Sequence, residues 1–596
     1  MIKRLALLLP ALIALAGCGK SPTGSPATNA EAPTKDEPVQ LETTGEVDPI
    51  AAPDALKGGS LTTWAGGYPK SLNMWLDYNS FSKKLCSLMF ESLVEMHSTK
   101  DEPIGSLAQS WEVSPDEKTF TFHLDPRAKW SDGKPVTAED VQFYYDTIMD
   151  PKNLTSLFRV DLSRFSRPEV LDEHTLRVTA KEAHWANFWA LAGMVAFPKH
   201  VWQGLDFNKQ NFDFPVVSGP YALGEVKTNR SIQLKRRGDW WGRAKRYNIG
   251  KYNFDYLLFK AMTDRDKTLE LLKSGGLDLF PIYTASIWVE KTNFPQVQKN
   301  WIVRQAIANK EPKGFQGIAL NLRRPIFQDP KVRQALALLI NRPLMNEKLM
   351  FNQYFLLNTY YPDLYPGNDN PGFPLTPYDP EKARALLKDV GWTVGPDGIL
   401  QKDGQPFSVT ITHYDNDLRH LNIYVQALKS VGIDAKIDVI SMSTFQKRMD
   451  NHEFDMCWAP WGASRLRDPE ASWSSKTADD IATNNITGVK DPEIDRLIEQ
   501  QKTEMNLAKR NDILRQIDAR LLAIGSYVLL WENAKTKLLY WNKFGTPKYV
   551  LSKFDNEDAA VTYWWYDPAK AAALDKAMKT DTALPAPPPE IVYPEE

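Results

Sequence analysis

The residues with the clearest chemical pattern lie near the start of the chain. Gly19, Lys20 and Ser21 form the second half of the phosphate-binding loop pattern G-x-x-x-x-G-K-[ST]. That pattern also requires a glycine where this chain has Ala14, and a helix directly after the loop. The residues that follow, SPTGSPATNAEAPT, are too rich in proline, glycine and serine to form that helix. The pattern is therefore not a nucleotide-binding loop.

The same segment has the layout of a secretory signal peptide. Lys3 and Arg4 precede an apolar run over residues 5–16, which is too short to span a bilayer comfortably. The run ends in Leu-Ala-Gly-Cys, which resembles a bacterial lipobox, where Cys18 would receive a diacylglycerol and become the mature N-terminus. We predict a signal peptide over residues 1–17 and a lipid anchor on a membrane surface. An ordinary signal peptide with an incidental cysteine is the alternative.

A second group of chemically capable residues lies in HYDNDLRH. His413, Asp415, Asp417 and His420 are all of types that ligate metal ions. The group falls between a predicted strand and a predicted helix, where Asp and Asn commonly cap the first helical turn. We therefore predict a helix cap here, and no metal or other cofactor.

Sequence motifs of catalysis are absent. There is no H-E-x-x-H zinc motif, no G-x-S-x-G nucleophile elbow and no G-x-G-x-x-G dinucleotide turn. Cys86 and Cys457 lack a recognisable catalytic partner, and whether they pair with each other stays open. We predict that the protein is not an enzyme.

Composition bounds the architecture and the partners. The chain of 596 residues has room for two large domains or three smaller ones, and its 43% hydrophobic and 24% charged content is typical of globular proteins. A net charge of −2 gives no electrostatic reason to expect nucleic acid. No stretch after the signal is apolar enough for a transmembrane helix. The 19 tryptophans suit either a large core or a ligand cleft.

Turn residues and periodicity indicate mixed α/β structure. Hairpins are predicted with turns at residues 114–116 and 172–173. Thr137 is the expected N-cap of a helix, with Asp140 three residues on. The helix should bury one face, formed by Val141, Tyr144, Tyr145 and Ile148.

A β-α-β unit is predicted further along the chain. Its strands run over about 407–413 and 433–440 with a helix between them, an arrangement that builds parallel sheets. Residues 18–58 are rich in proline, alanine and acidic side chains, and we expect a disordered tether after the lipidated cysteine. Residues 571–596, ending in TALPAPPPEIVYPEE, are expected to form a disordered tail.

An ordered set of segments resembles one bacterial family. FESLVE, IGSLAQSWEVSPDEKTFTFHLDPRAKWSDGKPVTAEDVQFYYDTI, VVSGPYAL, IALNLRRPIFQDPKVRQALALLINR and YDPEKARALLKDVGW occur in the order seen in extracellular solute-binding proteins of family 5. These are the oligopeptide, dipeptide and nickel receptors of ABC importers. The segment RRGDWWGRAKRYNIGKYNFDYLLF further resembles the long-peptide or microcin-type subgroup.

The resemblance implies an α/β fold of the two-lobed periplasmic-binding-protein type II kind, with mixed sheets, hinge strands and an extra subdomain in the first lobe. The expected divisions are a first lobe over 59–315, a second lobe over 316–530 and a return to the first lobe over 531–570. We expect the hinge crossings near Ile318–Leu322 and Val528–Glu532, with lobes that close on a ligand.

Candidate ligand residues come from the resemblance and from residue type. Family peptide receptors often place an aspartate for the peptide ammonium after the strand that here reads FDMCWAPWG, and the nearest match is Asp468. Arg465 and Arg467 intervene and could instead grip a carboxylate or phosphate, or Arg467 and Asp468 could form a turn with a surface ion pair. The other candidates are Trp458, Trp461, Tyr68, Ser218, Gly219 and Asn321, each also compatible with simple packing.

The function predicted from the sequence is a lipid-anchored, extracytoplasmic receptor, in the periplasmic space or at the cell surface. It would act as a monomer that binds peptides and delivers them to an ABC permease. Oligosaccharides, modified peptides and metal chelates stay open as ligands, because tryptophans also suit sugar stacking. A hydrolase on the same scaffold and a sensory or structural surface lipoprotein are the alternatives of a different class.

Overall fold

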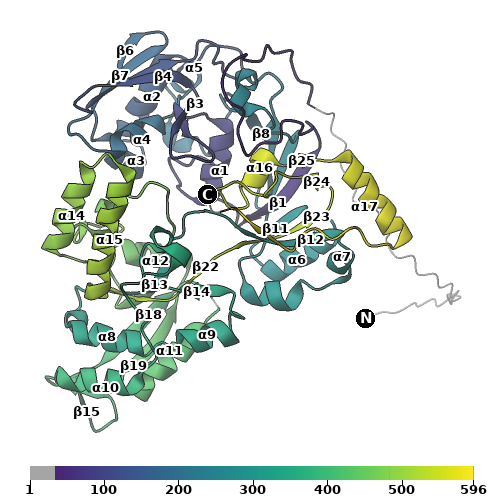
Figure 1. Cartoon of the computed structure of the whole chain (residues 1–596). Coiled ribbons are helices and arrows are strands. Elements are labelled where there is room, and N and C mark those ends of the chain that lie inside the picture. The colour runs from purple at the N-terminus through teal and green to yellow at the C-terminus, as the bar shows by residue number, and fades with distance from the viewer. Residues whose placement is uncertain (1–33, 416, 482, 595–596) are drawn as a thin grey trace, which may run out of the picture. The chain divides into compact units, whose positions relative to one another are not determined.

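The computed structural model describes residues 34–415, 417–481 and 483–594. Two large sheets organise the described chain (Figure 1). We call residues 34–308 and 536–594 the first lobe and residues 315–529 the second lobe. The eight-stranded sheet of the first lobe has the order β26 (Glu590–Val592), β12 (Ile302–Ala308), β23 (Thr536–Trp541), β11 (Leu279–Pro281), β1 (Ser60–Gly66), β10 (Tyr256–Ala261), β9 (Ser231–Arg236) and β8 (Tyr221–Lys227).

The second lobe contains the predicted β-α-β unit. Its five-stranded sheet has the order β19 (Asp434–Val439), β18 (Ser408–His413), β20 (Met456–Trp461), β13 (Phe315–Leu320) and β21 (Tyr527–Leu529). Strands β18 and β19 are parallel, and α11 (Arg419–Ser430) connects them, so this prediction is confirmed. The helix buries Leu421, Tyr424 and Leu428 against the sheet, which is why its apolar residues recur every three to four positions.

The extra subdomain of the first lobe holds both predicted hairpins. Strands β4 (Ala108–Val113), β5 (Thr119–Leu124), β7 (Thr175–Thr179) and β6 (Glu169–Asp172) form one antiparallel sheet. The predicted helix is α2 (Ala138–Met149), and the Asp140 carboxylate accepts the backbone N–H of Thr137 at 3.0 Å. All four residues of its predicted face are buried.

The helices share a recurrent start signal. An aspartate caps the first turn and proline occupies the first helical position, where its missing N–H costs nothing, in α8, α10, α14 and α17. The helices are α1 (Ser80–Met89), α2, α3 (Ser156–Leu162), α4 (Ala186–Ala192), α5 (Lys199–Trp202), α6 (Arg265–Lys273), α7 (Pro295–Gln298), α8 (Pro330–Leu338), α9 (Arg342–Lys348), α10 (Pro380–Asp389), α11, α12 (Met442–Asp450), α13 (Glu470–Trp473), α14 (Pro492–Lys502), α15 (Leu507–Ile524), α16 (Ala559–Tyr563) and α17 (Pro568–Thr580).

The remaining short strands form small two- and three-stranded sheets. They are β2 (Val94–Met96) with β3 (Pro103–Gly105), β14 (Tyr354–Leu356) with β22 (Trp531–Asn533), β15 (Thr393–Val394), β16 (Leu400–Lys402) and β17 (Gln405–Pro406) together, and β24 (Phe544–Gly545) with β25 (Trp565–Tyr566).

Two segments connect the lobes. The chain passes from β12 to β13 through residues 309–314 and returns from β21 to β23 through residues 530–535. The first passage lies a few residues before the expected crossing at Ile318–Leu322. Those residues instead form the end of β13 in the five-stranded sheet and the turn after it. The second overlaps the expected Val528–Glu532.

The part of the expected tether that the structure describes differs from the prediction. The backbone N–H groups of Glu37 and Glu42 donate to the carbonyls of Gly238 and Ala244 at 3.0 and 2.8 Å. Asp48 and Ile50 are buried. Residues 34–58 are therefore attached to the first lobe, because a few buried side chains anchor a stretch whose composition alone suggests disorder. The predicted signal peptide and Cys18 lie outside the described residues.

The expected disordered tail also contains structure. Helix α17 buries Leu574 and Ala577, and β26 pairs in parallel with β12, with Ile307 opposite Ile591. The outer edge of β12 offers unpaired backbone groups, so a short segment with little apolar content can still be held there. Among the described residues, no helix combines the length and apolarity needed to cross a membrane.

Candidate functional site

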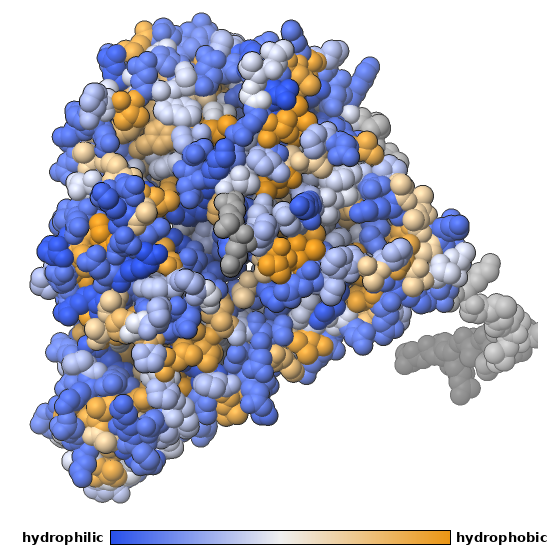
Figure 2. All heavy atoms as spheres, in the orientation of Figure 1, coloured by the Kyte–Doolittle hydropathy of each residue, from blue (hydrophilic) through white to orange (hydrophobic). Residues whose placement is uncertain are grey.

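A cavity of about 530 Å³ lies where the two lobes and both connecting segments meet. The face in Figure 2 is mainly hydrophilic and is hollowed near its middle. The cavity lining includes Arg265, Tyr283, Thr284 and Glu557 of the first lobe, Lys313 and Glu532 of the connecting segments, and Tyr354, His413, His420, Trp458 and Trp461 of the second lobe.

Buried polar atoms without hydrogen-bond partners gather at this cavity. Within the described part of the chain, five lining side chains have such an atom: His413 Nδ1, His420 Nε2, Trp458 Nε1, Lys537 Nζ and Glu557 Oε2. Native structures satisfy most buried polar groups, so each exception asks for an explanation. Five exceptions around one cavity are explained if a polar ligand binds there.

Charges of both signs face the cavity. The lining has five acidic side chains and five basic ones: Glu311, Asp415, Asp417, Glu532, Glu557, Arg265, Lys313, Arg419, Lys535 and Lys537. Burial, together with the neighbouring Asp558, raises the pKa of Glu557 to about 7. Burial also raises the pKa of Glu532. The cavity is thus not selective for one charge sign, which suits a ligand with both.

Aromatic side chains form a second feature of the lining. Trp461 ends β20, and its indole Nε1 donates to the Tyr527 hydroxyl at 3.1 Å. The ring of Trp458 packs against His413 at 5.2 Å between centroids. Across the lobes, the Tyr354 hydroxyl donates to the Tyr283 carbonyl at 2.8 Å. Both predicted tryptophans therefore lie in the cavity wall.

The predicted charged residues after β20 lie elsewhere. Arg465 reaches the first lobe, where it donates to Asp101 at 2.9 Å and to the His97 carbonyl at 3.0 Å. Arg467 pairs with Asp363 of its own lobe. Asp468 accepts the backbone N–H of Glu470 at 3.0 Å. None of the three lines the cavity beside the tryptophans.

The other predicted residues occupy packed positions. Ser218 is buried and its hydroxyl accepts the Glu91 N–H at 3.0 Å, while a side chain at Gly219 would meet the Leu88 carbonyl at 2.6 Å. Asn321 is buried and donates to two carbonyls of the second lobe. Tyr68 stacks on Phe212 at 5.8 Å. These contacts favour packing over ligand binding at all four positions.

The HYDNDLRH segment has a different role from the predicted cap. Helix α11 begins after Leu418 with no side-chain cap, because the Asp417 carboxylate pairs with Arg419 at 2.6 Å. The capping prediction is therefore wrong. His413 and His420 instead line the cavity, and burial lowers the pKa of both, that of His420 to about 4. Both rings are thus neutral at neutral pH.

One group of metal-ligating types occurs among the described residues: His184, Asp468 and Glu470, whose ligand atoms lie within 4.8 Å of one another. His184 Nδ1 accepts the Ala186 N–H at 3.0 Å, so the neutral ring carries its proton on Nε2. That nitrogen faces Asp468 at 3.6 Å and cannot also ligate a metal. At this separation Nε2 makes no hydrogen bond, so the pair is a close contact between the lobes.

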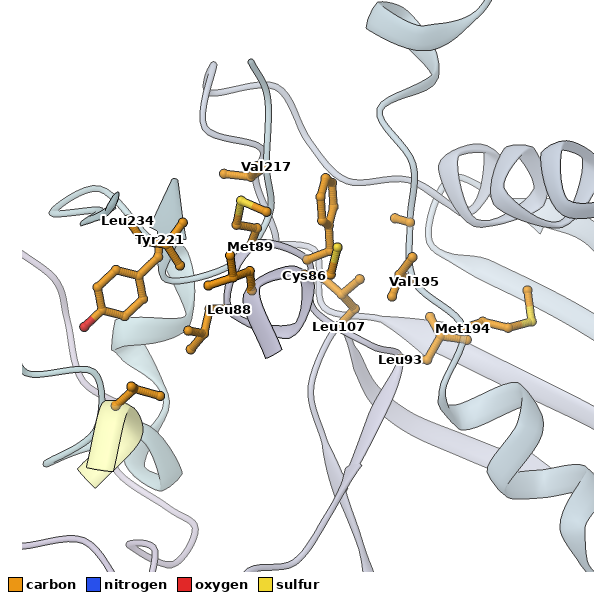
Figure 3. Packing of buried hydrophobic residues seen from close by; sticks show 14 of the residues in the cluster. Cys86, Leu88, Met89, Leu93, Leu107, Met194, Val195, Val217, Tyr221 and Leu234 are labelled. Carbon is orange, nitrogen blue, oxygen red and sulfur yellow. The ribbon is translucent and has the colours of Figure 1, made fainter. Parts of the chain in front are cut away.

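The two cysteines that the structure describes are free and buried. Figure 3 shows Cys86 on α1 among apolar side chains of the hydrophobic core of the first lobe, including Met89 and Leu107. Burial raises the pKa of the Cys86 thiol to about 12 and raises that of Cys457 further. Since the thiolate is the reactive form, neither cysteine is suited to be a nucleophile.

We expect both thiols to resist a disulfide reagent in the native protein. A chain that starts after Cys18 should release almost no thionitrobenzoate over an hour, because burial suppresses both access and ionisation. The same protein in guanidinium should release two equivalents. Rapid release from the native protein would contradict the buried positions of both residues.

The sequence interpretation named none of the ten charged residues that line the site as a ligand residue, and Lys537 and Glu557 are the two with unsatisfied buried atoms. Lys537 stands in TKLLYW, a strand in which every residue is buried, and a lysine inside such a strand is an available signal. Glu557 is in a loop, NEDAA, that resembles any exposed acidic turn. No local pattern marks it.

Comparison with known proteins identifies relatives. A family model described as bacterial extracellular solute-binding proteins, family 5 Middle, matches residues 102–483. The probable peptide-binding protein YejA of Agrobacterium fabrum is 27% identical over 83% of this chain and 87% of its own. The peptidoglycan-binding protein YepA of the same organism is 25% identical over 89% of this chain and 94% of its own.

Solved structures show the same fold. The oligopeptide-binding protein AppA from Bacillus subtilis, in complex with a nonapeptide, matches with a TM-score of 0.72 and 21% identity. The match covers 86% of this chain and 100% of AppA. The two-lobed α/β architecture predicted from the sequence is thereby confirmed.

Proposed function

The chain belongs to the bacterial extracellular solute-binding proteins of family 5, and we propose that it is a peptide receptor of an ABC importer. The observation that carries the proposal is the cavity between the lobes, with five unsatisfied buried polar atoms and charges of both signs. A peptide has an ammonium, a carboxylate and a row of amide groups, so it can satisfy such a lining. The names of two relatives, a probable peptide-binding protein and a peptidoglycan-binding protein, agree with this class of ligand.

Backbone segments at the cavity support an extended ligand. Residues 311–314 and 461–463 both line it, and Gly314 approaches the Trp461 carbonyl so closely that a side chain would not fit. Main-chain groups at the ends of strands can pair with an extended peptide whatever its sequence. The aromatic wall would then accept varied side chains.

The receptor would act as a monomer that closes on its ligand by motion about residues 309–314 and 530–535. It would be anchored outside the cytoplasm through Cys18. We expect that Cys18→Ser moves the protein from the membrane fraction to the soluble extracytoplasmic fraction, because no described helix spans a membrane. Membrane retention of the Cys18→Ser protein after a salt wash would contradict the lipid anchor.

A thermal-shift panel tests the peptide proposal. The chain from residue 19 onward is first unfolded and refolded to remove carried-over ligand. It is then melted with di- to decapeptides, a peptidoglycan-derived tetrapeptide, oligosaccharides and nickel chelates. A ligand at 100 times its dissociation constant adds about 2.7 kcal/mol of stability, which shifts a cooperative melt measurably.

We expect a shift with peptides only. A shift with sugars or chelates alone would reject the peptide class and keep a solute receptor. Mass spectrometry of the peptides after incubation with the protein tests the hydrolase alternative. Intact peptides would contradict it. No shift with any class would favour a sensory or structural lipoprotein.

A further inference from the structure

Lys537 is a buried cation at the cavity with no hydrogen-bonding or anionic partner among the described residues. Its side chain is 4% exposed, and its ammonium has no hydrogen bond or ion pair to any of residues 34–415, 417–481 or 483–594. Its position is fixed, because β23 pairs with β12 on one side and the Lys537 carbonyl accepts the Ile282 N–H at 2.8 Å on the other. The backbone at Lys537 is therefore fixed within the eight-stranded sheet, and its side chain lines the cavity.

The surroundings of Lys537 are cationic. Lys535 pairs with Glu590 at 2.7 Å, and Arg304 stacks on Trp288 at 3.7 Å while donating to Thr292. Burial, together with repulsion from these two cations, lowers the pKa of Lys537 to about 8. The ring of Tyr354 lies 5.4 Å from the ammonium. An unpaired charge in such a place is costly, and an anion supplied by a ligand would offset the cost.

We propose that Lys537 binds a carboxylate of the ligand and makes that carboxylate a requirement for tight binding. This rests on the proposed function, in which the ligand is a peptide. Two sources could supply the group: the C-terminal carboxylate or an acidic side chain. A carboxylate would accept hydrogen bonds from the ammonium, neutralise the local cationic cluster and offset the desolvation of Lys537. The proposal therefore assigns a specificity residue on the first-lobe wall, remote in sequence from the tryptophans.

The test uses calorimetric titration of the refolded protein with a peptide that shifts its melt. Three forms of that peptide are compared: the free acid, the C-terminal amide, and a form whose acidic side chains are replaced by their amides. We expect the wild-type protein to bind one of the two neutralised forms at least about tenfold more weakly than the parent, as for loss of a charged hydrogen bond. The form that weakens identifies the source of the carboxylate.

Variants assign the effect to Lys537. Lys537→Met should abolish the preference, and Lys537→Arg should retain most of it. Lys260→Met is the matched control, since Lys260 lies on β10 of the same sheet and does not line the cavity. Without ligand, Lys537→Met should melt at a higher temperature than the wild type, because it removes an unpaired buried cation.

The possible failures are distinct. If the wild type binds all three peptide forms equally, or if Lys537→Met keeps the preference, the carboxylate proposal is overturned while the peptide function stands. If no peptide binds the wild type, the proposed function fails and the role of Lys537 fails with it. A lower melting temperature of unliganded Lys537→Met would show that Lys537 stabilises the fold, which also contradicts the proposal.

Discussion

Replacement of Asp48 by alanine is expected to destabilise the first lobe by about 3–5 kcal/mol, the usual cost of removing one partner of a buried ion pair. The Asp48 carboxylate pairs with Lys251 at 2.7 Å and accepts hydrogen bonds from Ser98, Ile50 and Tyr563 at 2.7–2.9 Å. Both charged side chains are nearly inaccessible to solvent. Without Asp48, the Lys251 ammonium would stay buried and lose its counter-ion.

Thermal unfolding and limited proteolysis measure this effect. The Asp48→Ala protein should melt several degrees lower, and residues 34–58 should be cleaved faster because their anchor is gone. Asp54→Ala is the control, since Asp54 is an exposed acidic residue of the same segment. If both variants melt and are cleaved alike, the segment is not held by the Asp48 pair.

The contribution of Asp48 should also depend on pH in a defined direction. Burial opposes ionisation, but Lys251 and the hydrogen bonds outweigh it and hold the pKa of Asp48 below its ordinary value. A carboxyl whose pKa is depressed by folding contributes stability above its unfolded pKa of about 3.9 and loses it as the pH falls through the folded pKa. The gap between wild type and Asp48→Asn should therefore be constant from about pH 5 upward and shrink in acid.

Asp48 also shows why the tether could be only partly predicted. The sequence signals used for elements are local: apolar periods, caps and turn residues, and these located the hairpins, α2 and the β18-α11-β19 unit. Residues 34–58 contain turn residues such as Asp48-Pro49 but no apolar period that indicates a helix or a strand. They are held by partners about 50 to 515 positions away, such as Ser98 and Tyr563, and such pairing has no local signature.

The site shows the same limit. Trp458 and Trp461 were accessible to prediction because they lie on a strand, β20, in a segment that resembles the family. Arg465, Arg467 and Asp468 follow directly, yet their side chains turn to Asp101, Asp363 and the α13 backbone. The direction of a loop side chain depends on which partner the folded chain places near it, in the same lobe or in the other. Lys537 and Glu557 join the cavity only because the chain returns to the first lobe after the second is complete.

Loss of two sets of contacts that join the lobes outside the cavity is expected to weaken peptide binding about 100-fold, if each set contributes roughly 1–2 kcal/mol. Arg465 donates to the first lobe at Asp101 and His97, and stacks on Phe554 at 3.8 Å. Trp185 of the first lobe is buried against the second, where its indole donates to Gln501 at 2.8 Å and Arg510 stacks over its ring at 4.3 Å. The change is Arg465→Ala combined with Trp185→Ala.

These residues do not line the cavity at the connecting segments, so their effect on affinity must pass through closure of the lobes. The apparent dissociation constant rises in inverse proportion to the closed fraction. The unliganded double variant should therefore have a larger radius of gyration in solution scattering than the wild type, and saturating peptide should bring the two together. Arg496→Ala is the control, because the side chains that Arg496 is seen to bond among the described residues, Glu493 and Gln500, both lie on α14. Weaker binding with unchanged scattering would mean that Arg465 or Trp185 touches the ligand directly. Unchanged binding and scattering would mean that residues 309–314 and 530–535 alone govern closure. The contacts of Arg465 and Trp185 would then form on closure without stabilising it.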